Sequence, residues 1–204
     1  MKIGVIQASS QIEKNTILYE CTKDYGEVIN FGCFEDEENY SYVEIALEIC
    51  LLISSQVVDF IVTGCSSGQG MMIACNSLPN LICGYLPTPQ DAYLFGRIND
   101  GNVASLPLGL NYGWAGEINL KATLQQLFEE PFGIGYPLKD AKRKKEDTKK
   151  IKELNQLAKK DVITFLDELD QQMINKILSK KNVIDYILKY GKDKRIKQWI
   201  LNRR

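Results

Sequence analysis

A glycine-rich stretch at residues 64–70 carries the side chains best suited to chemistry in this sequence. It joins an apolar, strand-like run at 57–63 to a helix-like segment at 71–77 and reads Gly64-Cys65-Ser66-Ser67-Gly68-Gln69-Gly70. In a strand–turn–helix arrangement, glycines let backbone N–H groups converge, and the helix N-terminus adds partial positive charge. The stretch is therefore predicted to form an anion pocket.

Cys65 places a thiol at this predicted pocket, where the helix dipole favours the thiolate. Ser66 and Ser67 add hydroxyl donors. Such a pocket could hold an enediolate oxyanion while the thiolate moves a proton between adjacent carbons. The alternative is that Cys65 is a small packed residue in a phosphate-binding turn, and the residues alone leave the two readings about equal. The turn matches neither the Walker pattern nor Gly-x-Gly-x-x-Gly.

The composition excludes several other mechanisms. The 204 residues include no histidine, which excludes Ser-His-Asp and Cys-His catalysis and any His-ligated metal. The remaining cysteines form no Cys-x-x-Cys pair, so we expect reduced, mostly buried thiols in a cytoplasmic protein. They are Cys21, Cys33, Cys50, Cys75 and Cys83. No apolar run approaches the ~20 residues of a membrane span, so no membrane association is expected.

The elements that must position the turn alternate between strands and helices. Strands are predicted at 3–6, 28–31, 57–63, 81–85 and 103–106, and helices at 12–24, 40–55, 70–77, 89–97 and 115–129. Five alternations predict an open α/β fold, with a parallel sheet of about five strands and helices on both faces. Because ligands bind outside the carboxyl ends of such strands, a site is expected on the loops at 7–11, 64–70, 86–89 and 98–102.

A basic helical extension is predicted at 138–204, after a first domain at 1–137. The net charge is −11 over residues 1–136 and +10 over 137–204. Asp161 is expected to cap a helix that continues to Ile177, and a last helix is expected at 183–190, ended by Gly191. Lysines and acids are interleaved without aromatic residues, which favours a solvated face, or docking on a second subunit's acidic body, over nucleic-acid binding.

Two further stretches allow a functional and a structural reading. Tyr112 and Trp114 could stack on a sugar, but we expect both rings to be partly buried at the start of the helix 115–129. The acidic run at 34–38 could suggest a metal site, but an exposed loop is the preferred interpretation.

Cys65–Asn76 resembles the ribose-5-phosphate isomerase B / galactose-6-phosphate isomerase (RpiB/LacA/LacB) family. The family motif is Cys-Gly-Thr-Gly-x-Gly-x-x-Ile-Ala-x-Asn. This chain has Cys65-Ser66-Ser67-Gly68-Gln69-Gly70-Met71-Met72-Ile73-Ala74-Cys75-Asn76. Ile98–Val103 is similar to the family's His-Asn-Asp-x-Asn-Val element. The resemblance covers roughly residues 1–137 and is closer still to a longer, divergent branch that shares Gly113–Glu117 and Gly135–Pro137.

The resemblance implies Rossmann-like subunits in a homodimer or dimer of dimers. Such an enzyme isomerises a phosphopentose or phosphohexose without metal or organic cofactor. Cys65 would be the base that shuttles the proton, with the Ser67 hydroxyl and the turn's amides holding the intermediate. The residues implied to contact substrate are Ser66, Gly68, Gln69, Gly70, Asn99, Ser9 and Tyr42, with Tyr40 as the alternative to Tyr42.

The chain departs from the family at several functional positions. Ile98 replaces the ring-opening histidine, and Ala8-Ser9 replaces an Asp-His pair, leaving Ser9, Ser10 and Gln11 as the polar groups there. Tyr136, Pro137 and Asp140 stand where the family has its Arg/His phosphate clamp. The predicted function is a sugar-phosphate aldose–ketose isomerase acting through an enediolate. The alternative is a non-catalytic sugar-phosphate-binding protein, or one subunit of a hetero-oligomeric isomerase.

Overall fold

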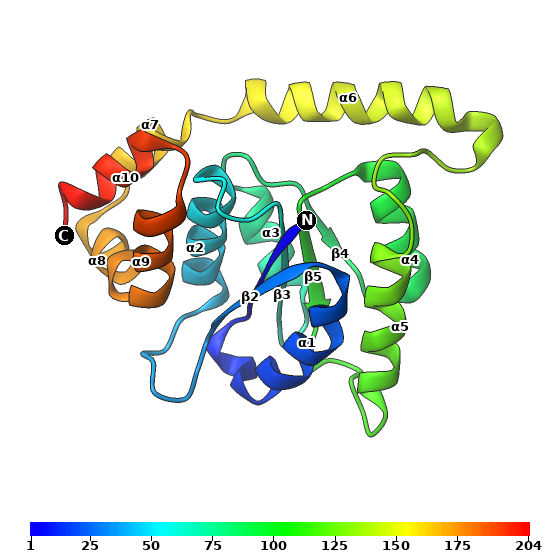
Figure 1. The fold of residues 1–204 in the computed structure, drawn as a ribbon, viewed down its shortest axis with the longest axis horizontal. Helices are drawn as coiled ribbons and strands as arrows, with labels where there is room; N and C mark the ends of the chain where they lie inside the picture. The colour runs from blue at the N-terminus through cyan, green and yellow to red at the C-terminus, as the bar shows by residue number, and fades with distance from the viewer.

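Five apolar runs pair into one parallel sheet in the computed structural model, which describes residues 1–204 (Figure 1). The strand order is β2-β1-β3-β5-β4. The strands are β1 (Lys2–Ile6), β2 (Glu27–Gly32), β3 (Phe60–Cys65), β4 (Cys83–Tyr85) and β5 (Val103–Pro107). The chain leaves β1 toward one edge for β2 and then crosses to the other side for β3, so the strand order reverses beside β1.

Helices cover both faces of this sheet. One face packs on α1 (Asn15–Thr22), α4 (Pro89–Leu94) and α5 (Gly116–Phe128), and the other on α2 (Tyr42–Ser54) and α3 (Gln69–Asn76). Short helical turns complete this part: η1 (Ser9–Lys14), η2 (Lys23–Tyr25) and the π-helical η3 (Phe95–Asn99). The predicted Rossmann-like α/β architecture is confirmed.

The residues at the start of α2 explain why that helix begins there. The Ser41 side chain accepts a hydrogen bond from the Glu44 backbone N–H, and the Glu44 carboxylate accepts one from the Ser41 backbone N–H. This reciprocal capping satisfies two donors that a helix end leaves open. Strand β3, in contrast, starts three residues later than predicted, because Val57 N–H bonds back to Leu52 at the end of α2.

The C-terminal extension is helical, but its divisions differ from the prediction. It contains η4 (Leu138–Asp140), α6 (Ala141–Ala158), α7 (Val162–Asp167), α8 (Gln171–Ser179), α9 (Lys181–Tyr190) and α10 (Lys194–Leu201). The single helix expected from Asp161 to Ile177 is wrong, because the Asp170 side chain accepts from Met173 N–H and starts a new helix. Gly191 ends α9 as expected, but α9 is not the last helix.

The extension packs on its own chain. One buried cluster joins α2 residues such as Ile45 and Ile49 to Val162, Ile184 and Ile196 of the extension. Because the two parts share this cluster, a domain boundary at residue 137 stays a prediction.

Three ion pairs join the extension to acids of the first part and reinforce this packing. They are Lys152–Asp100, Lys176–Glu38 and Lys180–Glu37. Part of the basic charge therefore meets the acidic body within one chain, rather than in a second subunit.

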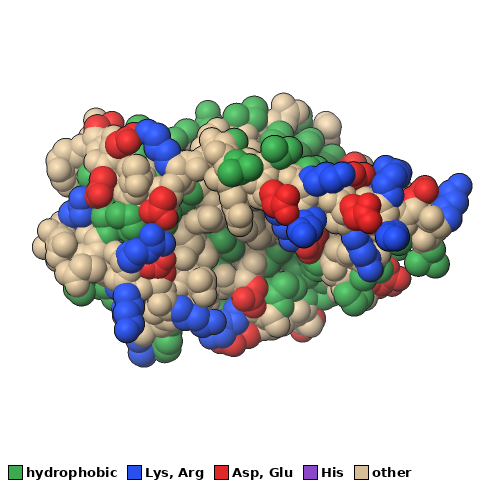
Figure 2. All heavy atoms as spheres, turned by 90° about the horizontal axis from the view of Figure 1, so that it is seen from above, with side chains coloured by type: hydrophobic (Ala, Val, Ile, Leu, Met, Phe, Trp, Pro, Cys, Tyr) green, Lys and Arg blue, Asp and Glu red, His purple; other side chains and the backbone are tan.

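Helix α6 is a long helix that lies along one side of the molecule (Figure 1). Its inner side is fastened by Asn155, which donates to Leu81 O at 3.2 Å, and by Lys159, which donates to Leu78 O at 2.7 Å. Basic and acidic side chains alternate along its outer side, with exposed apolar side chains among them (Figure 2). No helix of the chain combines the length and the apolar character that crossing a membrane would require.

Glu48 is a buried carboxyl group in the apolar face of α2. Its side chain is 1% exposed, and neither carboxyl oxygen has a hydrogen-bond partner. Burial raises the pKa of Glu48 well above its ordinary value of 4.5. The folded protein therefore keeps a proton that the unfolded chain releases near pH 4.5.

We expect Glu48→Gln to stabilise the protein increasingly as the pH rises. Above the unfolded pKa, the native state binds more protons than the unfolded state. Stability then falls by about 1.4 kcal/mol per pH unit until the folded pKa is reached. The variant removes this loss, so its advantage should grow as the pH rises above about 5 in urea unfolding. Parallel pH profiles for the two proteins would contradict the prediction.

Candidate active site

The carboxyl ends of the strands bring three of the four predicted loops to one edge of the sheet. The loops at 7–11, 64–70 and 86–89 follow β1, β3 and β4. The loop at 98–102 precedes β5, so it lies at the opposite edge, where the strands begin. The prediction that this loop borders the site is therefore wrong for a single chain. The loop that follows β5, residues 108–115, takes its place.

The turn between β3 and α3 exposes a set of backbone donors beside Cys65. Cys65 is the last residue of β3 and is buried. The backbone N–H groups of Ser66, Ser67 and Gly68 have no acceptor within the chain. The Ser67 hydroxyl accepts from Gln69 N–H at 3.3 Å, which leaves its own proton free to donate. Free donors at a helix N-terminus are what an anion needs.

Gly68 makes the turn possible. It has φ +76° and precedes α3. A Cβ at this position would lie 2.9 Å from both Leu106 C and Tyr85 Cε2. The Gly68 carbonyl accepts from the buried Ser105 hydroxyl at 2.6 Å. The left-handed backbone and the close packing together require glycine here.

Residues after β1 contact the outer side of the turn. The Gln11 amide donates to Ser66 Oγ at 3.0 Å. Ser9 lies next to it, where its Oγ accepts from Tyr40 N–H at 2.7 Å. Of the polar groups that the sequence indicated at this point, Gln11 contacts the Cys65 turn directly, and Ser9 begins the short helix η1 that carries Gln11.

Of the two candidate tyrosines, Tyr42 lies at the turn. Its ring faces Gly70, where an added Cβ would lie 3.3 Å from the ring carbons. The Tyr40 side chain points the other way and shares a 2.9 Å hydrogen bond with Ser179 of α8. Tyr42 is thus the tyrosine that can reach a ligand of the turn.

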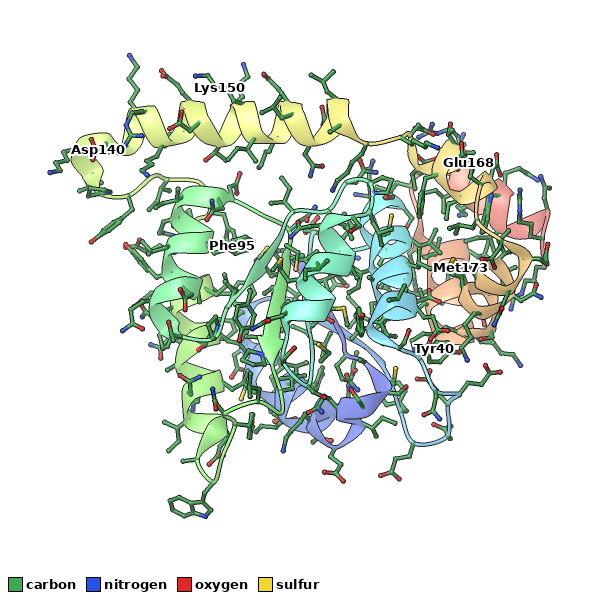
Figure 3. All side chains as sticks on the ribbon, turned by 180° about the vertical axis from the view of Figure 1, so that it is seen from behind. Tyr40, Phe95, Asp140, Lys150, Glu168 and Met173 are labelled. Carbon is green, nitrogen blue, oxygen red and sulfur yellow. The ribbon has the colours of Figure 1, made fainter.

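Asn99 and the substitutes of the phosphate clamp lie elsewhere in the chain. Asn99 is exposed at the end of η3, at the amino-terminal edge of the sheet. Tyr136 packs edge-to-face on Tyr93 of α4, with ring centroids 5.5 Å apart. Asp140 lies at the end of α6 remote from Tyr40 (Figure 3). A single chain does not bring these residues to Cys65.

A groove of about 510 Å³ lies beside the turn, over the ends of β4 and β5. It adjoins the turn through Pro107, which pairs with Cys65, and through Leu110, whose N–H donates to Ser66 O at 2.7 Å. The lining contains no charged side chain. Its aromatic, hydroxyl and amide members are Tyr85, Tyr112, Trp114, Thr88, Thr123, Asn111 and Asn119.

The two aromatic residues of the 108–115 loop differ from each other. Tyr112 is half-buried, as expected, and its ring packs beside Gly116. Trp114 is 98% exposed, so the prediction of a partly buried ring is wrong. Gly113 has φ +62° and no atom within 4 Å of an added Cβ, so this turn projects into open space and carries Trp114 with it.

Two parts of the site were missed from the sequence. The 108–115 loop could have been found by applying the carboxyl-end rule to the strand at 103–106. Glu37, in the acidic run expected to be an exposed loop, turns inward and pairs with Lys180, while Glu35, Asp36 and Glu38 are exposed. No local sequence signal marked that pair. The structure also has no cluster of three or more acidic or cysteine side chains suited to a metal ion.

Comparison with known proteins identifies the family of the chain. Residues 3–143 match the model of the Ribose/Galactose Isomerase family, LacAB_rpiB. The chain belongs to this family. The protein is therefore a sugar isomerase of the aldose–ketose class. No curated protein sequence matches the chain significantly.

Solved structures of isomerases share the fold of this Ribose/Galactose Isomerase family member. A 4-deoxy-L-threo-5-hexosulose-uronate ketol-isomerase complexed with a tartrate is 35% identical, with a TM-score of 0.94 over 100% of this chain and 99% of that one. A ribose-5-phosphate isomerase from Vibrio parahaemolyticus is 28% identical, with the same TM-score and coverage. A ribose 5-phosphate isomerase from Thermotoga maritima is 25% identical, with a TM-score of 0.55 over 71% of this chain and 97% of that one. The extension is thus shared with the first two structures.

We expect Gly68→Ala to destabilise this isomerase more than Gly113→Ala does. Both variants force alanine into a left-handed backbone, which costs about 1–2 kcal/mol, but Gly68→Ala alone also forces a Cβ against Leu106 and Tyr85. Urea unfolding measures the two losses, and the difference reports the close packing behind the turn. Equal losses would show that Leu106 and Tyr85 move aside freely.

Proposed function

We propose that the protein interconverts an aldose and a ketose by moving a proton between adjacent carbons, with Cys65 as the base. The observation that supports this proposal most directly is the set of free N–H groups at Ser66, Ser67 and Gly68. They lie beside the thiol, at the start of α3. The C–H group next to the carbonyl is too weak an acid for a base alone to remove its proton. Donors aimed at the developing oxyanion lower that barrier, and a site needs both parts together.

The proposed reaction has two proton transfers on carbon. The Cys65 thiolate takes the proton from the carbon next to the carbonyl, and the electron pair moves to the carbonyl oxygen to give an enediolate. The free N–H groups hold this oxyanion, and Ser67 Oγ lies in the same turn to donate to a substrate oxygen. The thiol then returns the proton to the former carbonyl carbon. The proton of the neighbouring hydroxyl passes to the oxyanion, so the former carbonyl oxygen becomes a hydroxyl and the neighbouring carbon becomes the new carbonyl. No electron is gained or lost overall.

The substrate contacts are proposed to lie around this centre. Ser66, Gly68, Gln69 and Gly70 belong to the turn, and Ser9 and Tyr42 lie at its outer side. The uncharged groove beside the turn suits the hydroxylated part of a sugar, because aromatic faces, amides and hydroxyls bind such groups without burying a charge.

Asn99 would act from a second copy of the chain. It lies at the opposite edge of its own sheet, so it can contact substrate at Cys65 only across an interface between subunits. The proposed homodimer, or dimer of dimers, would supply that contact. We also keep the cytoplasmic location as a proposal.

A second candidate substrate is a ketouronic acid instead of a sugar phosphate. The solved ketol-isomerase that acts on a hexosulose uronate is 35% identical to this chain over its full length. The residues that replace the phosphate clamp are Tyr136, Pro137 and Asp140, and none of them is an arginine or a histidine. A carboxylate carries less charge than a phosphate and needs fewer cationic partners.

The proposed mechanism predicts that solvent deuterium enters the carbon that receives the proton. Cys65→Ala should lower turnover by about 10²–10⁴-fold, the range attributed to a positioned acid–base group, while ligand binding is retained. Cys21→Ala, at a half-buried cysteine on α1, is the matched control and should keep wild-type turnover. Products would be followed by NMR in D₂O.

If no deuterium enters any sugar while ligands still bind, the protein is the non-catalytic binder or hetero-oligomer subunit named above. Full turnover of Cys65→Ala would remove Cys65 as the base.

The two substrate classes are distinguished by a direct comparison of kcat/KM. The panel would contain pentose 5-phosphates, hexose 6-phosphates and 4-deoxy-5-hexosulose uronate. We expect one class to be preferred by at least about tenfold, equivalent to ~1.4 kcal/mol of transition-state binding. A preference for the uronate would replace the sugar-phosphate prediction, and a preference for phosphates would require a cationic group at the site that a second copy supplies.

A further inference from the structure

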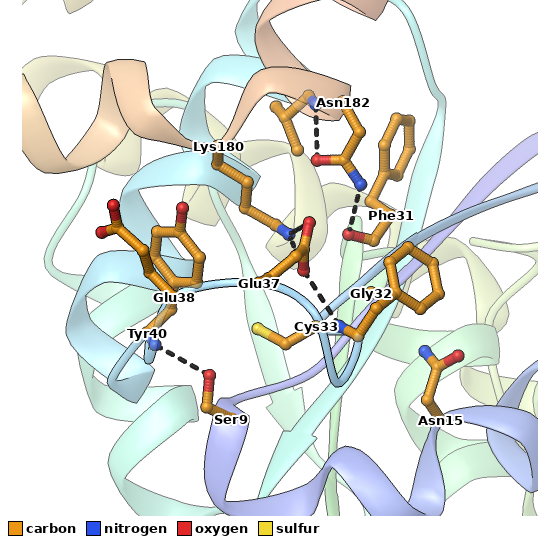
Figure 4. Close-up of polar contacts among 12 residues, drawn as sticks. Ser9, Asn15, Phe31, Gly32, Cys33, Glu37, Glu38, Tyr40, Lys180 and Asn182 are labelled. Carbon is orange, nitrogen blue, oxygen red and sulfur yellow. Dashed lines mark hydrogen bonds and ion pairs between the residues drawn. The ribbon is translucent and has the colours of Figure 1, made fainter.

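A wholly buried lysine ties the C-terminal extension to the loop that borders the site. Lys180 lies between α8 and α9, and its side chain is 0% exposed. Its ammonium group donates to both carboxylate oxygens of Glu37, at 2.8 and 2.7 Å (Figure 4). The Glu37 side chain is 18% exposed, so water screens this pair little. An ion pair buried to this degree is sensitive to removal of either partner.

Glu37 in turn shapes the loop between β2 and α2. Its Oε2 also accepts from the Phe34 backbone N–H at 2.9 Å, and the Glu37 N–H donates to Phe34 O at 3.2 Å. The carboxylate thus closes a tight turn at 34–37. Without Lys180 the same carboxylate would be buried without a countercharge, and the turn would have to open toward solvent.

The other end of this loop is held by the same junction of the extension. Tyr40 is 3% exposed, and burial raises its pKa to about 12, so the phenol stays protonated. It shares its 2.9 Å hydrogen bond with Ser179, the residue before Lys180. The ammonium of Lys180 also lies 5.1 Å from the centre of the Tyr40 ring, within cation–π range.

From Tyr40 the contacts continue to the Cys65 turn along two routes. Tyr40 N–H donates to Ser9 Oγ at 2.7 Å (Figure 4). In return, Ser9 N–H donates to Tyr40 O at 3.0 Å. Ser9 begins the short helix η1, in which Gln11 donates to Ser66 Oγ. Two residues after Tyr40, the ring of Tyr42 lies against Gly70.

We propose that Lys180 is a positioning residue for the active site. Through Glu37 and Tyr40 it holds Tyr42 against the Cys65 turn and fixes Ser9 at the start of η1, the helix whose Gln11 contacts the turn. It touches neither the turn nor any proposed substrate contact. The C-terminal extension is therefore part of the catalytic apparatus. The kinetic part of this proposal rests on the proposed function, whereas its structural part does not.

The test compares Lys180→Met with Lys181→Met. Lys181, the next residue, is exposed at the start of α9 and makes no ion pair, so its removal controls for losing a lysine at this junction. Two readouts are measured on the full chain: kcat and KM in turnover, and the iodoacetamide alkylation rate of each cysteine by peptide mass spectrometry. The alkylation rate needs no turnover, so it tests the proposal even if the isomerase activity is absent.

We expect Lys180→Met to fold, to lose at least tenfold in kcat and to change the alkylation rate of Cys65 at least threefold. Cys21, on α1, should react at the wild-type rate, and Lys181→Met should stay within twofold in both readouts. A folded Lys180→Met with kcat, KM and Cys65 alkylation within twofold of wild type would overturn the proposal.

If Lys180→Met does not fold, the double variant Lys180→Met/Glu37→Met replaces it, because it leaves no buried charge unpaired. The same changes in kcat and Cys65 alkylation support the proposal, and wild-type values overturn it. Failure of both variants to fold would make the contact an element of stability alone and would also overturn it.

Discussion

The left-handed backbone of Gly68 is the constraint on which the site depends. Leu106 and Tyr85 fill the space where a side chain would stand, and Ser105 holds the Gly68 carbonyl from behind. With the chain turned there, β3 ends at Cys65 and α3 begins at Gln69, so the intervening N–H groups have no acceptor inside the chain. The proposed chemistry thus uses backbone groups, which suits a protein without histidine.

The parallel sheet decides which other residues can join this turn. Because β1 and β5 flank β3, the segments that follow them, at 7–11 and 108–115, border the Cys65 turn on its two sides. One side is polar, with Ser9 and Gln11, and the other opens into an uncharged groove. The arrangement separates the proposed proton-transfer centre from the groove proposed to bind the rest of the sugar.

The extension changes how the acidic loop after β2 behaves. Charged side chains usually stay in water unless they are paired, and Glu37 is drawn inward because Lys180 is buried opposite it. The two solved isomerases that match over the full length of the chain also cover the extension. The ribose 5-phosphate isomerase from Thermotoga maritima, in contrast, covers only 71% of this chain. In the longer chain, the C-terminal extension thus contacts the loop between β2 and α2 from outside the sheet.

Much of the fold could be predicted from the sequence, because its signals are local. Apolar runs and their spacing indicated five strands, and the glycine-rich turn with Cys65 pointed to an anion pocket beside a thiol. Capping residues likewise marked individual helix ends, although Asp170 was overlooked and α7 and α8 were merged. What the sequence by itself determined is therefore the order of elements and the chemical character of the Cys65 turn.

The tertiary structure alone decided which distant residues meet that turn. It placed Tyr42 rather than Tyr40 against Gly70, put Asn99 at the far edge of the sheet, and left Trp114 in solvent. It also paired Glu37 with Lys180, 143 positions later. The physical reason is that such contacts depend on how strands cross and helices pack, and side-chain types along one chain carry no record of those distances.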